Sequence, residues 1–97
     1  MKRDEIVRIL HEQQKELVER YHIVSLSIFG SVVRGKARPD GKVNILVKFA
    51  RPTGLLQFID LKKQLETLLG CKVALGKPGW LKPQLKAIVL QEAVRVF

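Results

Sequence analysis

The apolar residues of this chain recur with two different periods, which divide its first half into helical and extended segments. Between Asp4 and Tyr21 they return every three or four residues, and this predicts one amphipathic helix. Residues 23–29 are mostly β-branched, apolar or aromatic and stop at a glycine, which predicts a strand with one buried face. A second strand of the same kind is predicted over residues 43–49.

The second half of the chain continues this alternation. Leucines at helical spacing predict a long helix that begins at Leu55 and ends at Gly70. A short strand is predicted over residues 71–75. Pro83 suits the first position of a last helix, which is predicted to extend through Val94.

This order implies a particular kind of sheet. A full helix joins the second and third predicted strands, whereas the first two are joined by about 13 residues with little helix. We therefore expect an α/β (α+β) fold: a small mixed sheet with helices mainly on one face, in a single domain spanning residues 1–97.

Charge is distributed unevenly along the 97 residues. Lysine and arginine total 18 against 9 acidic residues, a net charge of +9, yet residues 1–20 are balanced. The excess lies in residues 34–51 and 72–95. This pattern favours a polyanionic partner such as a nucleotide, a nucleic acid or an acidic protein face, and a solvated basic surface is the alternative.

Other features exclude several classes of protein. No apolar stretch reaches the roughly 18 residues of a membrane span, so we expect a cytoplasmic protein without a membrane partner. Cys71 is the single cysteine and is predicted to be a small core residue. His11 and His22 lack metal-ligand spacing and are expected at the surface or at a helix end. Trp80 either stacks a base or packs as an anchor.

One pair of residues has the composition of an anion site. Gly30 and Ser31 follow the first predicted strand directly and begin a short turn. Backbone N–H groups and a hydroxyl in this position can bind a phosphate. A Gly-Ser pair that ends a strand is, however, more often an ordinary turn.

The residues around this pair carry a more specific signal. Phe-Gly-Ser at residues 29–31, Arg34-Gly35, Ala-Arg-Pro-Asp at 37–40 and Leu-Val-Lys-Phe at 46–49 resemble the signature of the minimal nucleotidyltransferases, small relatives of DNA polymerase beta. Residues 81–83 and 88–94 are similar to the last helix of that family. The resemblance implies the nucleotidyltransferase fold and transfer of a nucleoside monophosphate from a nucleoside triphosphate with a divalent metal.

The chain departs from the family at the metal ligands. Two aspartates on one strand and a third on the next strand hold Mg²⁺ in the family, and here the matching positions are Lys42, Asn44 and Ala74. Mg²⁺ prefers oxygen ligands, especially carboxylates. We therefore expect no metal site and no catalytic residues at these degenerate positions. Asp40 lies two residues before Lys42 and could in principle replace the missing carboxylate, but it lies beside Pro39 in a predicted loop.

The family's phosphate-binding residues are partly retained. By resemblance, Gly30, Ser31 and Arg34 would hold the phosphates of ATP or another NTP. The Lys42 ammonium could then neutralise the phosphate charge where a metal would sit, which would give nucleotide binding without turnover. The alternative is that Lys42 is solvated and the pocket has lost its ligand.

Three hypotheses for function follow. The resemblance implies a small helical HEPN-type partner, because minimal nucleotidyltransferases are commonly the antitoxins of such pairs. The first hypothesis is a catalytically inactive binding or antitoxin-like module of this kind. The second is an active nucleotidyltransferase with altered metal chemistry. The third is a basic nucleic-acid-binding domain, which a steep salt dependence of DNA or RNA binding would favour.

Overall fold

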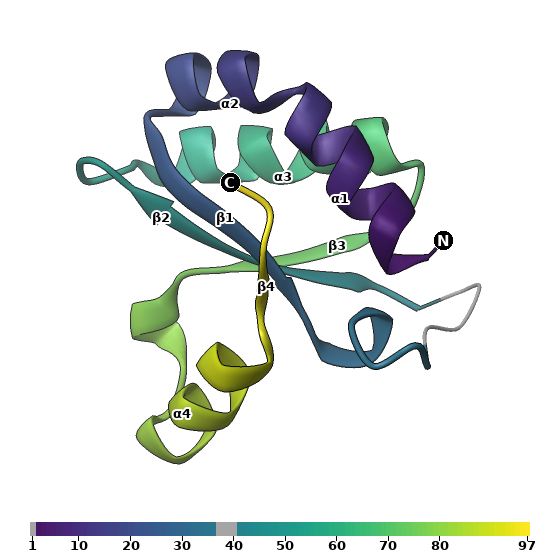
Figure 1. The fold of residues 1–97 in the computed structure, drawn as a ribbon. Coiled ribbons are helices and arrows are strands. Elements are labelled where there is room, and N and C mark those ends of the chain that lie inside the picture. The colour runs from purple at the N-terminus through teal and green to yellow at the C-terminus, as the bar shows by residue number, and fades with distance from the viewer. Residues whose placement is uncertain (1, 37–40) are drawn as a thin grey trace.

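The computed structural model describes residues 2–36 and 41–97, and there a four-stranded sheet separates three helices on one face from a fourth helix on the other (Figure 1). The strands are β1 (Ile23–Phe29), β2 (Val43–Phe49), β3 (Val73–Gly76) and β4 (Val94–Arg95), in the order β3-β2-β1-β4. β1 pairs antiparallel with both β2 and β4, and β2 pairs parallel with β3. The predicted mixed sheet is confirmed.

The sheet is apolar on the face that carries three helices. β1 alternates buried Leu26 and Ile28 with half-buried Ser25 and Ser27, so its residues divide cleanly between the two faces. The helices α1 (Arg3–Glu12), α2 (Gln14–Tyr21) and α3 (Leu55–Leu69) supply the other half of the core. Its fully buried members include Ile6, Leu10, Leu17, Tyr21, Leu26, Ile28, Ile45, Val47, Leu61, Leu65 and Val73.

The single helix predicted for Asp4 to Tyr21 is wrong in one respect, because it breaks at Gln13. Gln13 has φ −98° and ψ 8°, and its N–H donates to the Leu10 carbonyl at 3.1 Å. Between Leu10 and Leu17 the sequence has no strongly apolar residue that would have to face the core. A bend there lets both segments bury their leucines against the same sheet (Figure 1).

The end of the chain also differs from the prediction. The last helix, α4 (Pro83–Glu92), begins at Pro83 as expected but ends at Glu92, and Val94 belongs to β4 instead. Ala93 has extended backbone angles of −61° and 139°, which terminate the helix. Val94 then pairs with Ile28 and Arg95 with Ser27. Helical spacing alone could not predict β4, because whether an edge segment forms a strand depends on the neighbouring strand with which it pairs.

The fourth helix is unusual because it is apolar yet scarcely packed. No residue of α4 is buried, and Leu85, Ile88 and Leu90 remain 49%, 60% and 48% exposed. α4 lies on the face of the sheet opposite α1, α2 and α3 (Figure 1). This face, which we call the open face, carries the residues that the sequence singles out for chemistry.

The described residues form no helix with the length and apolar character that crossing a membrane requires.

Burial of the single tyrosine gives a pH-dependent prediction. Tyr21 is 2% exposed and its hydroxyl donates to Asp60 Oδ2 at 2.7 Å. Burial first, and the bond to Asp60 second, raise the pKa of Tyr21 from 10.0 to about 12. The unfolded phenol loses its proton near pH 10, so this contribution to stability is complete below pH 10 and is lost as pH rises toward 12.

Phenolate absorbance measures this directly, since the chain has one tyrosine. We expect a titration midpoint near 12 in the folded protein and near 10 in urea. Asp60→Asn should lower the folded midpoint while leaving it above 10, because burial persists. A folded midpoint at 10 would contradict the buried position of the ring.

Candidate functional site

Two of the three degenerate positions, Asn44 and Ala74, meet at one place on the open face. Asn44 lies opposite Phe29 of β1 and opposite Ala74 of β3 in the sheet register. Gly30 follows Phe29 directly, so the end of β1, the start of β2 and β3 converge here. The three strands therefore bring together Gly30, Asn44 and Ala74, as the resemblance to nucleotidyltransferases implies.

Gly30 is required by the geometry of this convergence. Its φ of +84° is in the left-handed region, which residues with a Cβ rarely adopt. A Cβ placed on Gly30 would also lie 2.6 Å from Asn44 Nδ2. The Asn44 side chain thus packs against the Gly30 backbone, and a larger residue at position 30 would have to displace it.

The turn after β1 arranges the next two predicted site residues. Gly30–Val32 form a short 3₁₀ helix, η1, in which the Val33 N–H donates to the Gly30 carbonyl at 3.0 Å. The Lys36 N–H donates to the Ser31 carbonyl at 2.9 Å, which closes the turn. Ser31 is half-buried, whereas Arg34 is exposed and projects from the turn.

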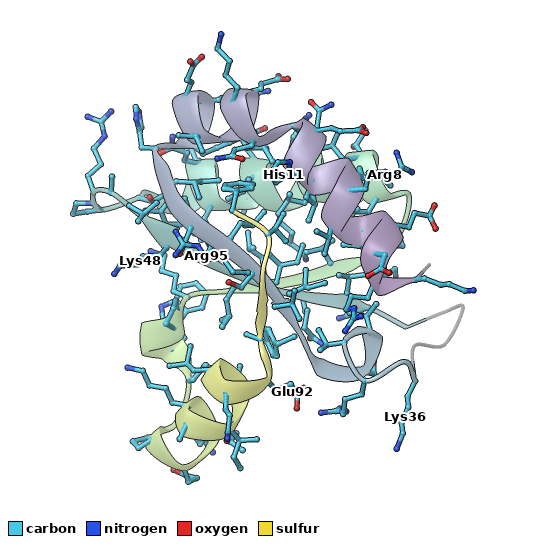
Figure 2. The ribbon with its side chains drawn as sticks, in the orientation of Figure 1. Arg8, His11, Lys36, Lys48, Glu92 and Arg95 are labelled. Atoms are coloured by element: carbon cyan, nitrogen blue, oxygen red, sulfur yellow. The ribbon has the colours of Figure 1, made fainter. Side chains whose placement is uncertain are left out.

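A residue that the sequence did not single out completes the site. Glu92, the last residue of α4, accepts the Gly30 N–H at 3.0 Å on Oε1. The same oxygen accepts Arg34 Nη1 at 2.8 Å, and Oε2 lies 3.0 Å from Nη1. Figure 2 shows Glu92 at the end of α4, beside the turn that follows β1. Glu92 lies 62 residues from Gly30, so no local spacing could have predicted the contact.

The residues present do not fit the Mg²⁺ of the nucleotidyltransferase reaction. Lys42 offers a cation, Asn44 a neutral amide and Ala74 a methyl group, where the ion needs carboxylate oxygens. The nearby Glu92 carboxylate is already bound by Arg34 and Gly30. Over residues 2–36 and 41–97, no group of three or more histidine, cysteine, aspartate or glutamate side chains could hold a metal ion.

Lys42 stands at the entrance to β2 and is exposed. The next residue, Val43, donates its N–H to the Lys72 carbonyl at 3.0 Å, which brings two lysine positions together at this end of the sheet. No described contact joins Lys42 to Gly30, Ser31 or Arg34. Its assignment to phosphate binding stays a prediction, and Asp40 lies outside the described residues.

A cleft of about 530 Å³ lies between the open face and α4. Ser25, Ser27, Leu46 and Lys48 form its floor, and Leu90 and Arg95 are among its walls. Lys48 and Arg95 point toward this side of the sheet in Figure 2. The cleft combines apolar walls with two cations and has a volume in the range of small-molecule sites.

The contacts of Trp80 and His22 favour structural roles for both residues. Trp80 is 61% exposed and packs at 5.0 Å from Phe58, with the Lys77 ammonium 5.5 Å from its ring, which favours the anchor interpretation. His22 caps α2 in the left-handed conformation, and its ring contacts Arg51.

Four further residues can be placed in the same way. His11 is exposed, as expected, and so are Lys62 and Lys63 on α3. Cys71 is only partly buried rather than a full core residue, and burial raises the pKa of its thiol.

Comparison with known proteins identifies the family. Residues 10–96 match the model of the nucleotidyltransferase domain. The chain belongs to this family. It is 44% identical over 93 residues to the protein adenylyltransferase MntA of Thermococcus cleftensis, covering 96% of this chain and 94% of that protein. The resemblance inferred from residues 29–49 is thereby confirmed.

Solved structures agree with this assignment. A structure named as a minimal nucleotidyltransferase has a TM-score of 0.80 and 38% identity, and it covers 97% of this chain and 95% of its own. A Shewanella oneidensis complex of a tri-AMPylated HEPN toxin with an MNT antitoxin has a TM-score of 0.66 at 15% identity, covering 94% and 71%. At this low identity, the similarity to the complex shows a shared fold alone. The sequence and the fold of this chain therefore both match the nucleotidyltransferase family.

Proposed function

We propose that this nucleotidyltransferase-family chain is an antitoxin-like binding module that pairs with a HEPN-type protein and does not transfer nucleotides by the two-metal route. The partner is supported by the toxin–antitoxin complex among its structural neighbours and by its similarity to MntA. Loss of transfer is supported by the chemistry at positions 42, 44 and 74. The alternative is an active transferase that obtains its metal ligands elsewhere.

A single observation carries the loss of transfer. Asn44 and Ala74 are register partners on neighbouring strands, so they are the positions from which two carboxylates would converge on an ion. Neither has a charge, and Lys42 adds a positive one beside them. In two-metal catalysis, protein carboxylates would hold ions that stabilise the attacking and leaving oxygens. The chain does not supply ligands for them at this place.

The surface of α4 supports a protein partner. Leu85 and Ile88, one turn apart on the side of this helix away from the cleft residue Leu90, are about half exposed or more, and Trp80 is exposed just before the helix. Exposed apolar groups that lie close together commonly mark interaction surfaces. A helical partner of the HEPN type would bury them, which gives the first surface to test by mutation.

The test combines co-purification with a transfer assay. The chain is co-expressed with a HEPN-type protein, and the complex is separated by size-exclusion chromatography and incubated with Mg²⁺ and α-labelled ATP. We expect co-elution without label on either chain. Ile88→Glu should abolish co-elution, because it places a charge in the proposed contact. Lys86→Gln, on the opposite side of the same helix and with the same change of charge, should not.

The alternatives give different results. Metal-dependent label on the partner would establish the active transferase and contradict the loss of transfer. Elution of the two proteins as separate peaks would contradict the partner. The same elution profile for Ile88→Glu and the parent complex would place the contact away from α4.

A further inference from the structure

The Glu92 carboxylate occupies the place where Gly30 and Arg34 would meet a phosphate. The Gly30 N–H and Arg34 Nη1 both point to Oε1, at 3.0 and 2.8 Å. Two donors from the turn after β1 thus converge on one anionic oxygen of a residue that is 58 and 62 positions away in the sequence. Such charge-assisted bonds are stronger than those between neutral groups.

The burial of the two partners is unequal. The Glu92 side chain is 22% exposed, whereas Arg34 is 53% exposed. The Glu92 carboxylate is therefore mostly shielded from solvent beside the turn, whereas the Arg34 side chain is open to solvent. An entering phosphate can reach Arg34 without obstruction, but it meets the Gly30 N–H only where Glu92 now lies.

We propose that Glu92 is a built-in competitor for the anion that Gly30 and Arg34 would otherwise bind. The inference rests on the proposed function only in taking this pair as the nucleotide-phosphate position. A phosphate can displace the carboxylate because both are anionic oxygen acceptors of the same donors. Nucleotide binding by this chain is then weakened by its own last helix.

The competition also affects α4. No residue of α4 is buried, and its apolar side chains make no buried core contact, so the bonds from Glu92 are the main polar contacts between this helix and the body of the protein. An anion that displaces Glu92 removes them. Anion binding and loosening of α4 are therefore expected to occur together.

Calorimetric titration tests the competition without any metal. The probes are inorganic tripolyphosphate and ATP, each in EDTA, added to the parent chain and to Glu92→Gln. The amide preserves the shape of the side chain but removes its charge, so we expect about tenfold tighter binding of both probes. Glu19→Gln, on the exposed side of α2, changes the net charge equally and should leave the affinity unchanged.

Additional variants keep the result interpretable. Arg34→Gln combined with Glu92→Gln should lose the gain in affinity. Glu92→Asp is the substitute if Glu92→Gln does not fold. Its shorter side chain cannot keep both contacts, so we expect an intermediate gain in affinity. Equal affinity in the parent and in both Glu92 variants would overturn the proposal. So would a gain that persists without Arg34.

Hydrogen exchange reports on the helix itself. In the parent chain, saturating tripolyphosphate should accelerate amide exchange in α4 and leave α3 unchanged. Unchanged exchange in α4 on binding would overturn the link between the anion and the helix. Either result is independent of co-elution with a HEPN-type protein, so this proposal and the proposed function can fail separately.

Discussion

Aspartate at positions 42, 44 and 74 together should give this chain Mg²⁺-dependent binding of ATP. Asn44 and Ala74 are register partners, and residue 42 lies two positions before Asn44 at the entrance to β2, so we expect three carboxylates to converge beside Gly30. The net charge falls from +9 to +5, since lysine to aspartate removes two units and each other change removes one. Calorimetry should show binding at least about a hundredfold tighter with Mg²⁺ than with EDTA.

The control for this variant keeps its shape without its charge. Lys42→Asn with Ala74→Asn, and Asn44 retained, places three amides at the same positions and should show no response to Mg²⁺. The aspartate variant should melt at a lower temperature than its control in EDTA, because like charges repel, and recover with Mg²⁺. Equal ATP affinity with Mg²⁺ and with EDTA would mean that these positions are not the family's metal site.

Leu61→Ala should unfold the protein more easily by about 2–5 kcal/mol. Leu61 is fully buried in the middle of α3, where it packs in the core under β1 and β2. Truncation removes apolar contacts and leaves a cavity that the close-packed core fills only in part. For a chain of 97 residues this is a large fraction of the total stability.

The same helix offers the matched control. Leu56 is 83% exposed, so Leu56→Ala should change the free energy of unfolding by less than about 0.5 kcal/mol. Urea denaturation followed by circular dichroism measures both. A similar loss in the two variants would contradict the assignment of the core to this face of α3.

Much of the fold could be predicted from the sequence because apolar residues recur at regular spacing along most of its helices and strands. β1, β2 and α3 begin and end where the pattern predicts, with Gly70 closing α3 in the left-handed conformation. Alternation and helical spacing reflect burial of one face, which each segment shows locally. The break at Gln13 was missed because helical spacing continues on both sides of it.

The sequence predicts a place for the candidate site, which stays a prediction, whereas one of its contacts could not be predicted. Gly30 and Arg34 follow a buried strand in a family-like motif, and the register brings Asn44 and Ala74 beside them as the resemblance implies. Glu92 could not be predicted, because its partners are 58 and 62 residues away. In the sequence it stood out only as the lone acid of residues 72–95 and as part of residues 88–94, which resemble the family's last helix.

The sequence by itself determined three of the four strands, the long helix, the family and the absence of aspartate at the three positions that match the family's metal ligands by resemblance, since these depend on local periodicity and residue identity. Only the tertiary structure decided that Val94 joins the sheet, that α4 lies almost unburied on the open face, and that Glu92 binds the Gly30–Arg34 pair. An edge strand, the docking of a helix and an ion pair between distant residues all depend on partners that folding brings together. No pattern within one segment contains them.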